Sequence, residues 1–165
     1  MSRPGTPPFV RRRAAPVRRR TRGLTMIELS LVLGIVAVLI SLAIPMWNGW
    51  RDKVRVKQAQ DDIIGISVVV EGFLSDNGRL PTSLAEVGRS GLRDPWGRAY
   101  VYLDLGNSPP GSARKDHSLV PLNTDYDLYS TGPDGASSPP LTAASSRDDI
   151  VRANNGRFIG PASQY

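Results

Sequence analysis

The feature that most constrains this chain is a run of 22 uncharged residues at positions 29–50, with the sequence LSLVLGIVAVLISLAIPMWNGW. As an α-helix rising about 1.5 Å per residue, the run would span roughly 33 Å, enough to cross a hydrocarbon core of about 30 Å. Arginines precede the run, and Trp47 and Trp50 lie at its end. Because positive charge stays in the cytoplasm and tryptophan favours the membrane interface, we predict a single-pass membrane helix whose C-terminal side lies outside the cytoplasm.

The basic character of the chain is concentrated in its first 23 residues. The formal net charge is +6, but eight of the 21 Lys and Arg residues lie in this segment, which contains no acid. The remaining sequence carries 13 basic and 15 acidic side chains, so nucleic acid is not expected as a partner. A segment rich in Arg, Pro and Gly with few apolar residues cannot form a core, and we interpret residues 1–23 as a cytoplasmic leader peptide.

Two residue types limit the chemistry that the chain can perform. The sequence contains no cysteine, which excludes disulfides, thiolate metal sites and cysteine nucleophiles. The single histidine, His117, lies in the polar segment RKDHSL and is expected at the surface. One histidine leaves little scope for a zinc site or a Ser-His-Asp triad, so we predict that the protein is not an enzyme.

The apolar run is predicted to continue as an amphipathic helix instead of being removed as a secretory signal. No A-x-A type cleavage site follows it, and charged residues separate apolar ones that recur at near-helical spacing. Asn77 and Gly78 are predicted to end the helix. The recurring apolar residues are Trp47, Trp50, Val54, Ala59, Ile63, Ile66, Val70 and Phe73 or Leu74.

Short strands are predicted after the helix. Residues 99–103 (AYVYL) and 126–130 (YDLYS) are rich in aromatic and β-branched side chains, and Ile150 and Val151 are expected to start a third short pairing. Residues 106–123 have the composition of a loop. We therefore predict an α+β fold in which a long N-terminal transmembrane and amphipathic α-helix packs on a small antiparallel β-sheet.

The junction RGLTMIELS at residues 22–30 resembles the processing site of type IV prepilins and type II secretion pseudopilins. The resemblance implies that prepilin peptidase cleaves after Gly23, that Leu24 becomes the methylated N-terminus, and that Glu28, the fifth mature residue, directs filament assembly. Family members usually begin with Phe or Met at the position of Leu24. The alternative for Glu28 is an interfacial carboxylate stabilised by the helix N-terminus.

Four later segments resemble, in order, landmarks of the major pseudopilin of type II secretion, the G subunit: DNGRLPTSL, DPWGRAYVY, DLYSTGPDG and SRDDIV. The resemblance implies a type IV pilin-like fold, with a cleaved leader at 1–23, an assembly helix at 24–47 and a periplasmic domain at 48–165. It implies a filament subunit that is anchored in the bacterial inner membrane before assembly and spans the periplasm afterwards. The implied partners are further copies, minor pseudopilins, prepilin peptidase, an inner-membrane platform with a cytoplasmic ATPase, and an outer-membrane secretin.

Two other functions are compatible with these residues. The chain resembles type IV pilins through the same junction, so a pilin or minor pilin serving adhesion, motility or DNA uptake is the nearest alternative. The second is a membrane-anchored calcium-binding module that never polymerises.

The resemblance also implies that a C-terminal loop binds calcium. The ion takes six to eight oxygen ligands from carboxylates and carbonyls, and carried over by motif the acids are Asp134 and Asp148, with Asp149 as a further ligand or a structural acid. An insert, ASSPPLTAASS, separates the two acidic clusters and is longer than the family's loop. The backbone carbonyls predicted to complete the shell belong to Thr131, Ala136 and Ser146.

Overall fold

The fold is seen in a computed structural model that describes residues 23–109 and 111–165. The predicted leader, apart from Gly23, lies outside the described residues. Helix α1 (Met26–Asn77) comes first and is followed by strands β1 (Val101–Asp104), β2 (Tyr126–Ser130), β3 (Ile150–Ala153) and β4 (Phe158–Pro161). Three short 3-10 helices lie between or after the strands: η1 (Leu105–Asn107), η2 (Ala144–Ser146) and η3 (Ala162–Gln164). The chain divides into two compact units, one ending at Ala43 and the other spanning Ile44–Tyr165.

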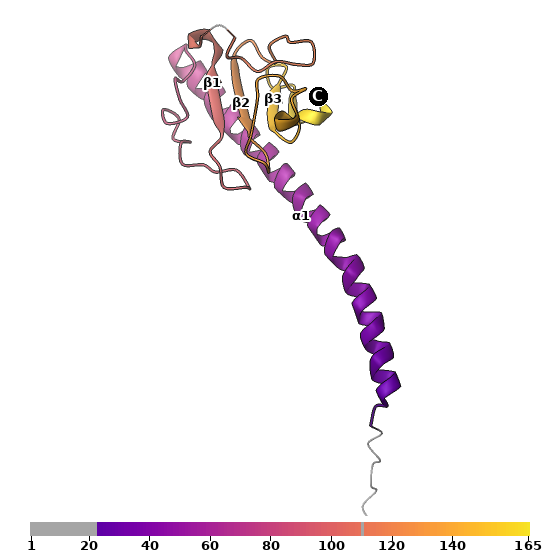
Figure 1. The fold of residues 1–165 in the computed structure, drawn as a ribbon. Coiled ribbons are helices and arrows are strands. Elements are labelled where there is room, and N and C mark those ends of the chain that lie inside the picture. Colours follow the sequence, from indigo (N-terminus) through magenta and orange to yellow (C-terminus); the bar gives the residue numbers. More distant parts are fainter. Residues whose placement is uncertain (1–22, 110) are drawn as a thin grey trace, which may run out of the picture. The chain divides into compact units, whose positions relative to one another are not determined.

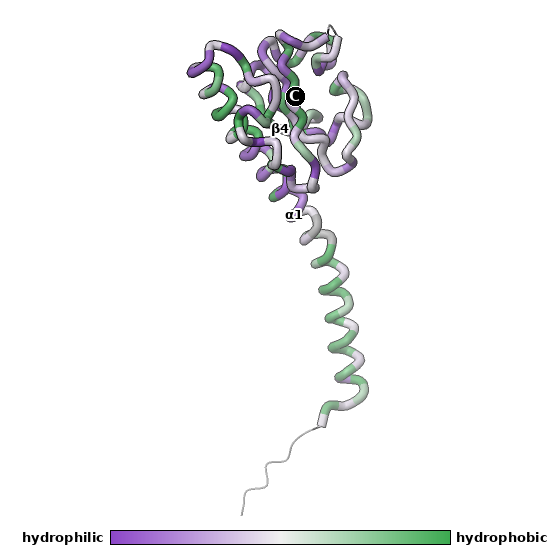
Figure 2. The backbone as a smooth tube through the Cα atoms, turned by 90° about the vertical axis from the view of Figure 1, so that its left-hand side faces the viewer, coloured by the Kyte–Doolittle hydropathy of each residue, from purple (hydrophilic) through white to green (hydrophobic). Residues whose placement is uncertain are grey.

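Helix α1 is 52 residues long and ends where the sequence predicts. The side chain of Asn77 donates a hydrogen bond of 2.9 Å to the carbonyl of Phe73, and Gly78 follows with φ 66°, a left-handed conformation that favours glycine and terminates helices. The N-terminal part of α1 is mostly hydrophobic (Figure 2) and is long and apolar enough to cross a membrane. Its side chains are exposed wherever the structure describes them up to Val54, so this part of the helix has no protein core of its own to pack against.

The four strands form one antiparallel sheet in the order β1-β2-β3-β4. The register pairs Tyr102 with Leu128, and Tyr129 with Val151. Strand β2 has the predicted bounds, β3 extends the predicted pairing at Ile150, and β1 begins two residues later than predicted. Strand β4 was missed because the sequence FIGP contains Gly and Pro, which are rare within strands, and it is accommodated at the sheet edge. The predicted α+β, pilin-like layout is confirmed, whereas its metal-binding loop stays a prediction.

The core lies between one face of the sheet and the C-terminal part of α1, which crosses the sheet in Figure 1. Buried helix residues at spacings of three and four, which place them on one face, meet buried residues of β2, β3 and the segment before β1. Gln60 adds a hydrogen bond of 3.2 Å to the carbonyl of Ile159 in β4. The predicted helix stripe is thus confirmed in its middle, whereas Trp47, Trp50, Val54 and Leu74 are exposed. The core residues are Ala59, Ile63, Ile66, Val70, Leu84, Tyr100, Tyr126, Leu128 and Ile150.

The insert at residues 136–146 folds against the long loop that precedes β2. Leu141 is only 2% exposed and packs in a second apolar cluster with Leu122 and Val151. The backbone of Lys115 donates to the carbonyl of Pro139 (2.8 Å) and accepts from the amide of Leu141 (3.0 Å). The insert is therefore a packed part of the domain, and it holds residues 114 and 115 beside the C-terminal loop.

An ion pair between a buried arginine and a partly exposed aspartate joins β3 to the turn before β2. Arg152 is 2% exposed, donates to Asp125 through both terminal nitrogens (2.9 and 2.7 Å), and lies over the ring of Tyr126 with its guanidinium carbon 3.9 Å from the ring centroid. Burial alone would raise the pKa of Asp125, but hydrogen bonds from Arg152 and from the Tyr126 amide lower it below its ordinary value. The pair therefore favours the ionised carboxylate in the folded protein.

We predict that Asp125→Asn destabilises the protein at pH 7 and that this difference shrinks as the pH falls. The folded pKa lies below the unfolded one, so the stability that Asp125 contributes is present above its ordinary pKa of about 4 and is lost as the pH falls through the folded value. Urea unfolding between pH 7 and pH 3 measures the difference. Asp52→Asn, which removes an exposed pair with Arg55 at 3.8 Å, serves as the control and should have little effect at either pH. A loss for Asp125→Asn that is the same at all pH values would contradict the prediction.

Candidate functional site

The N-terminal junction lies just before helix α1. Gly23 and Leu24 are exposed and non-helical, and the helix begins at Met26. The space around the Gly23 Cα is open, so nothing in the described chain covers the bond after it. An exposed, non-helical segment with a glycine at the cleavage point is accessible to a protease.

Thr25 and Glu28 form a reciprocal cap at the start of α1. The Glu28 amide donates to the Thr25 hydroxyl (3.2 Å), while the amide and hydroxyl of Thr25 both donate to Glu28 Oε2 (3.3 Å each). This is the capping-box arrangement, in which an N-cap Thr and a Glu three residues later satisfy each other's free donors. The Glu28 carboxylate thus lies at the positive end of the helix dipole, as the alternative interpretation from the sequence expects.

Capping does not use the full hydrogen-bonding capacity of Glu28. Its carboxylate has two oxygens, and the cap engages only Oε2. Glu28 is also exposed, and it is the only charged residue between positions 23 and 50. The first turn of α1 therefore presents one acidic side chain at the edge of an apolar helix, and one of its oxygens has no partner among the described residues.

The second predicted site, the C-terminal loop, is tied to the DPWG turn by Asp94. This side chain is 4% exposed and accepts hydrogen bonds from the amides of Trp96 (3.0 Å) and Arg98 (2.8 Å) and from the hydroxyl of Ser130 (2.5 Å). The Ser130 hydroxyl in turn accepts from the amide of Gly132 at 3.1 Å. One buried carboxylate therefore fixes both the turn before β1 and the start of the loop after β2.

Two of the three predicted acidic ligands lie close together. The Asp134 amide donates to Asp148 Oδ2 at 3.1 Å, and Asp134 Oδ1 accepts from the Ala136 amide at 2.8 Å. Gly132 makes the approach possible, because it has φ 61° and a Cβ there would overlap the backbone of Asp148. Backbone amides occupy one oxygen of each carboxylate, which leaves the other oxygen of each uncommitted.

The third acid, Asp149, is turned toward an arginine. It is 0% exposed, and its Oδ2 accepts from Arg114 (2.6 Å) and from the Ser137 hydroxyl (2.7 Å). Burial raises the pKa of Asp149 to about 6, and the hydrogen bond from Ser137 and the charge of Arg114 oppose that rise. Arg114 thus pairs with this carboxylate inside the protein, as the option of a structural acid expects.

The predicted carbonyl ligands are largely committed to the backbone. The Thr131 carbonyl accepts from the Gly135 amide (3.1 Å) and the Ser146 carbonyl from the Asp149 amide (3.3 Å). In the part of the chain that the structure describes, no three acidic or histidine side chains converge on one point. Calcium binding at these six residues therefore stays a prediction.

The sequence analysis missed two arginines that contact this loop. Arg98 donates to the carbonyls of Gly132 and Pro133, the latter at 3.1 Å. Arg114 is 4% exposed, donates to Ser137 and Asp149, and lies over the ring of Tyr129 at 4.2 Å. The one sequence signal that could have identified Arg98 is its position directly after the DPWG landmark. Nothing in the sequence around Arg114 distinguishes it from a surface residue.

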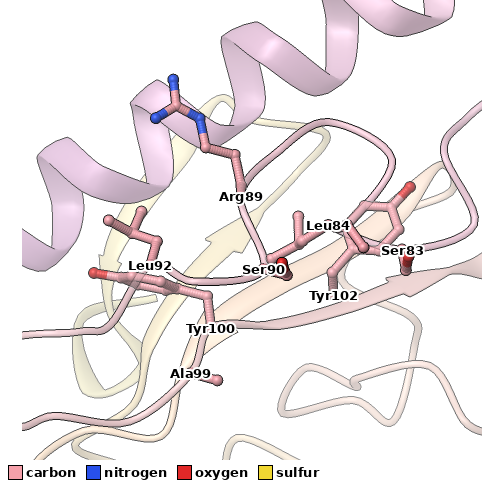
Figure 3. A pocket seen from close by; sticks show the side chains of 9 residues that line it. Ser83, Leu84, Arg89, Ser90, Leu92, Ala99, Tyr100 and Tyr102 are labelled. Carbon is pink, nitrogen blue, oxygen red and sulfur yellow. The ribbon is translucent and has the colours of Figure 1, made fainter.

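A separate hollow of about 280 Å³ lies between residues 83–92 and the segment entering β1 (Figure 3). Tyr100 and Tyr102 line it, and their hydroxyls donate away to Asp62 (2.8 Å) and to the carbonyl of Pro81 (2.9 Å). Its lining contains no acid and no histidine. The hollow therefore offers neither a metal site nor a general base.

His117 is exposed, as predicted.

Curated proteins with similar sequences share one name. The chain is 28% identical over 137 residues to "Type II secretion system core protein G" of Escherichia coli, which covers 70% of this chain and 84% of that protein. It is 29% identical over 134 residues to the protein of that name from Pseudomonas aeruginosa. The match covers 72% of this chain and 87% of that protein.

The chain is similar to the G subunit of type II secretion. The relative from Dickeya chrysanthemi bears the same name and is 28% identical over 138 residues. The match covers 71% of this chain and 80% of the relative. No family model and no solved structure matches the chain. The suspected resemblance to the major pseudopilin is confirmed, and it supports a pseudopilin role in secretion, whereas the residues predicted for processing and calcium stay predictions.

We predict that Asp94→Ala lowers the free energy of unfolding by about 3 kcal/mol, because it leaves two amides and a hydroxyl without their buried, charged acceptor. Urea or thermal unfolding measures the loss. Asp76→Ala, at an exposed position near the end of α1, is the matched control and should change stability by less than about 0.5 kcal/mol. Equal effects of the two substitutions would contradict the role assigned to Asp94.

Proposed function

We propose that the mature protein is a non-enzymatic structural subunit of a type II secretion pseudopilus. Prepilin peptidase cleaves the chain after Gly23, and Leu24 becomes the methylated N-terminus. The subunits then polymerise through their N-terminal helices, with Glu28 directing assembly. The resulting filament helps to drive protein export across the outer membrane.

The observation that carries this proposal is the exposed apolar surface of α1 with a single acid in its first turn. Large apolar side chains are exposed along the helix from Met26 to Trp50. A surface of this kind is stable only in lipid or against other apolar helices. In lipid a charged residue is costly even when it is capped, so Glu28 favours an environment that supplies a cation, and the new amino group of a neighbouring subunit is such a cation.

The same features support the proposed location and partners. The N-terminal part of α1 anchors the subunit in the bacterial inner membrane, and the domain from residue 48 onward lies in the periplasm. Open helical polymers form through an interface that does not close on itself, and an exposed apolar helix can provide one. The machinery consists of minor pseudopilins, an inner-membrane platform with a cytoplasmic ATPase, and an outer-membrane secretin.

We predict that Glu28→Gln abolishes filaments but not membrane insertion when the protein is expressed with its assembly machinery. Gln at this position still completes a capping box, but it carries no charge to pair with an amine. The measurement combines electron microscopy of sheared filaments with fractionation of membranes. Ser41→Ala is the control within the same helix, since its hydroxyl bonds only to the Val38 carbonyl (2.7 Å), and this variant should assemble normally.

Two outcomes would contradict the proposal. Normal filaments from Glu28→Gln would show that Glu28 acts only as a helix cap. A wild-type protein that forms no filaments with its machinery would instead support an anchored module that does not polymerise.

A further inference from the structure

Loop 131–149, the C-terminal loop with its insert, is surrounded by positive groups that come from elsewhere in the chain. Arg98 reaches it from the DPWG turn, and Arg114 reaches it from the loop before β2. Both side chains donate hydrogen bonds to oxygens of the loop. A bound cation would instead interact with such oxygens as a metal ion, and in both cases a positive group offsets their negative charge.

Arg98 lies against the tight turn at the start of the loop. Its guanidinium donates to the carbonyls of Gly132 and Pro133, and a Cβ at Gly135 would overlap it. Gly135 has φ 73°, so glycine is needed there both for the backbone conformation and for the space that the guanidinium occupies. Since Gly135 lies between Asp134 and Ala136 in the chain, a calcium ion held by those two residues would be repelled by Arg98.

Arg114 neutralises the far end of the loop. It joins Ser137, at the start of the insert, to Asp149, which precedes β3, and the Ser137 hydroxyl closes the triangle by donating to Asp149 at 2.7 Å. The packing of Leu141 and the backbone pairing of Lys115 hold Arg114 in this position. The lengthened insert and the internal arginine therefore belong to one arrangement, which spans the gap between the two acidic clusters.

We propose that Arg98 and Arg114 are the cations that close loop 131–149 in this protein, so that the fold of the loop does not depend on calcium. Two guanidinium groups supply directed donors to Gly132, Pro133, Ser137 and Asp149, and they replace the positive charge of a metal. Calcium at millimolar concentration is then not needed to order the loop.

Hydrogen exchange of backbone amides in the full chain, purified in detergent, tests this proposal. In the wild-type protein the amides of residues 131–149 should exchange at the same rate with millimolar calcium and with a chelator. Slowing of these amides by about tenfold or more on adding calcium would overturn the proposal, because a metal that binds only the folded loop must stabilise it.

The variant Arg98→Ala supplies an independent arm. Loss of the charged hydrogen bonds should speed exchange in residues 131–135 by about tenfold, while amides of strands β2 and β3 keep their wild-type rates. Arg157→Gln, at an exposed position on the β3-β4 turn, is the matched control and should leave the loop unchanged. Exchange in Arg98→Ala that equals the wild type in this segment would also overturn the proposal.

Discussion

A long helix that exposes apolar side chains on every face has no stable place in water, and the rest of the structure depends on this constraint. Along the N-terminal part of α1 the described side chains are exposed, so the cost of hydrating them must be avoided by lipid or by other helices. Both environments have a low dielectric constant, which makes the position of the one acid, Glu28, decisive. The capping box with Thr25 gives that acid an internal partner until another one is available.

The same helix has a second role in the globular unit. From Ala59 to Val70 it presents residues on one face that fill the core against β2 and β3, so the domain cannot form without this part of α1. Polar interactions then fix the loops around that core. Asp94 joins the DPWG turn to Ser130, Arg152 joins β3 to Asp125, and Arg114 pairs with Asp149 at the end of loop 131–149.

The sequence predicts the helix and the central strand better than the polar contacts. Hydrophobic periodicity locates α1, the Asn77-Gly78 pair locates its end, and local composition gives β2 its bounds, because these properties depend on neighbours in the chain. Strand β4 escapes prediction because pairing at the sheet edge overrides its Gly and Pro. The roles of Arg98 and Arg114 escape it because their partners lie about 35 residues away. Of the two options that the sequence allows for Asp149, the pair with the distant Arg114 favours the structural acid.

The central claim is that the mature subunit begins at Leu24, since this position makes Glu28 the fifth residue and exposes an amine for assembly. Intact mass spectrometry of the protein expressed with prepilin peptidase tests it most directly. The predicted mass is that of residues 24–165 with one N-terminal methyl group, and a Gly23→Leu variant should retain its leader. A mature protein with any other N-terminus, or the same cleavage in the Gly23→Leu variant, would contradict the claim.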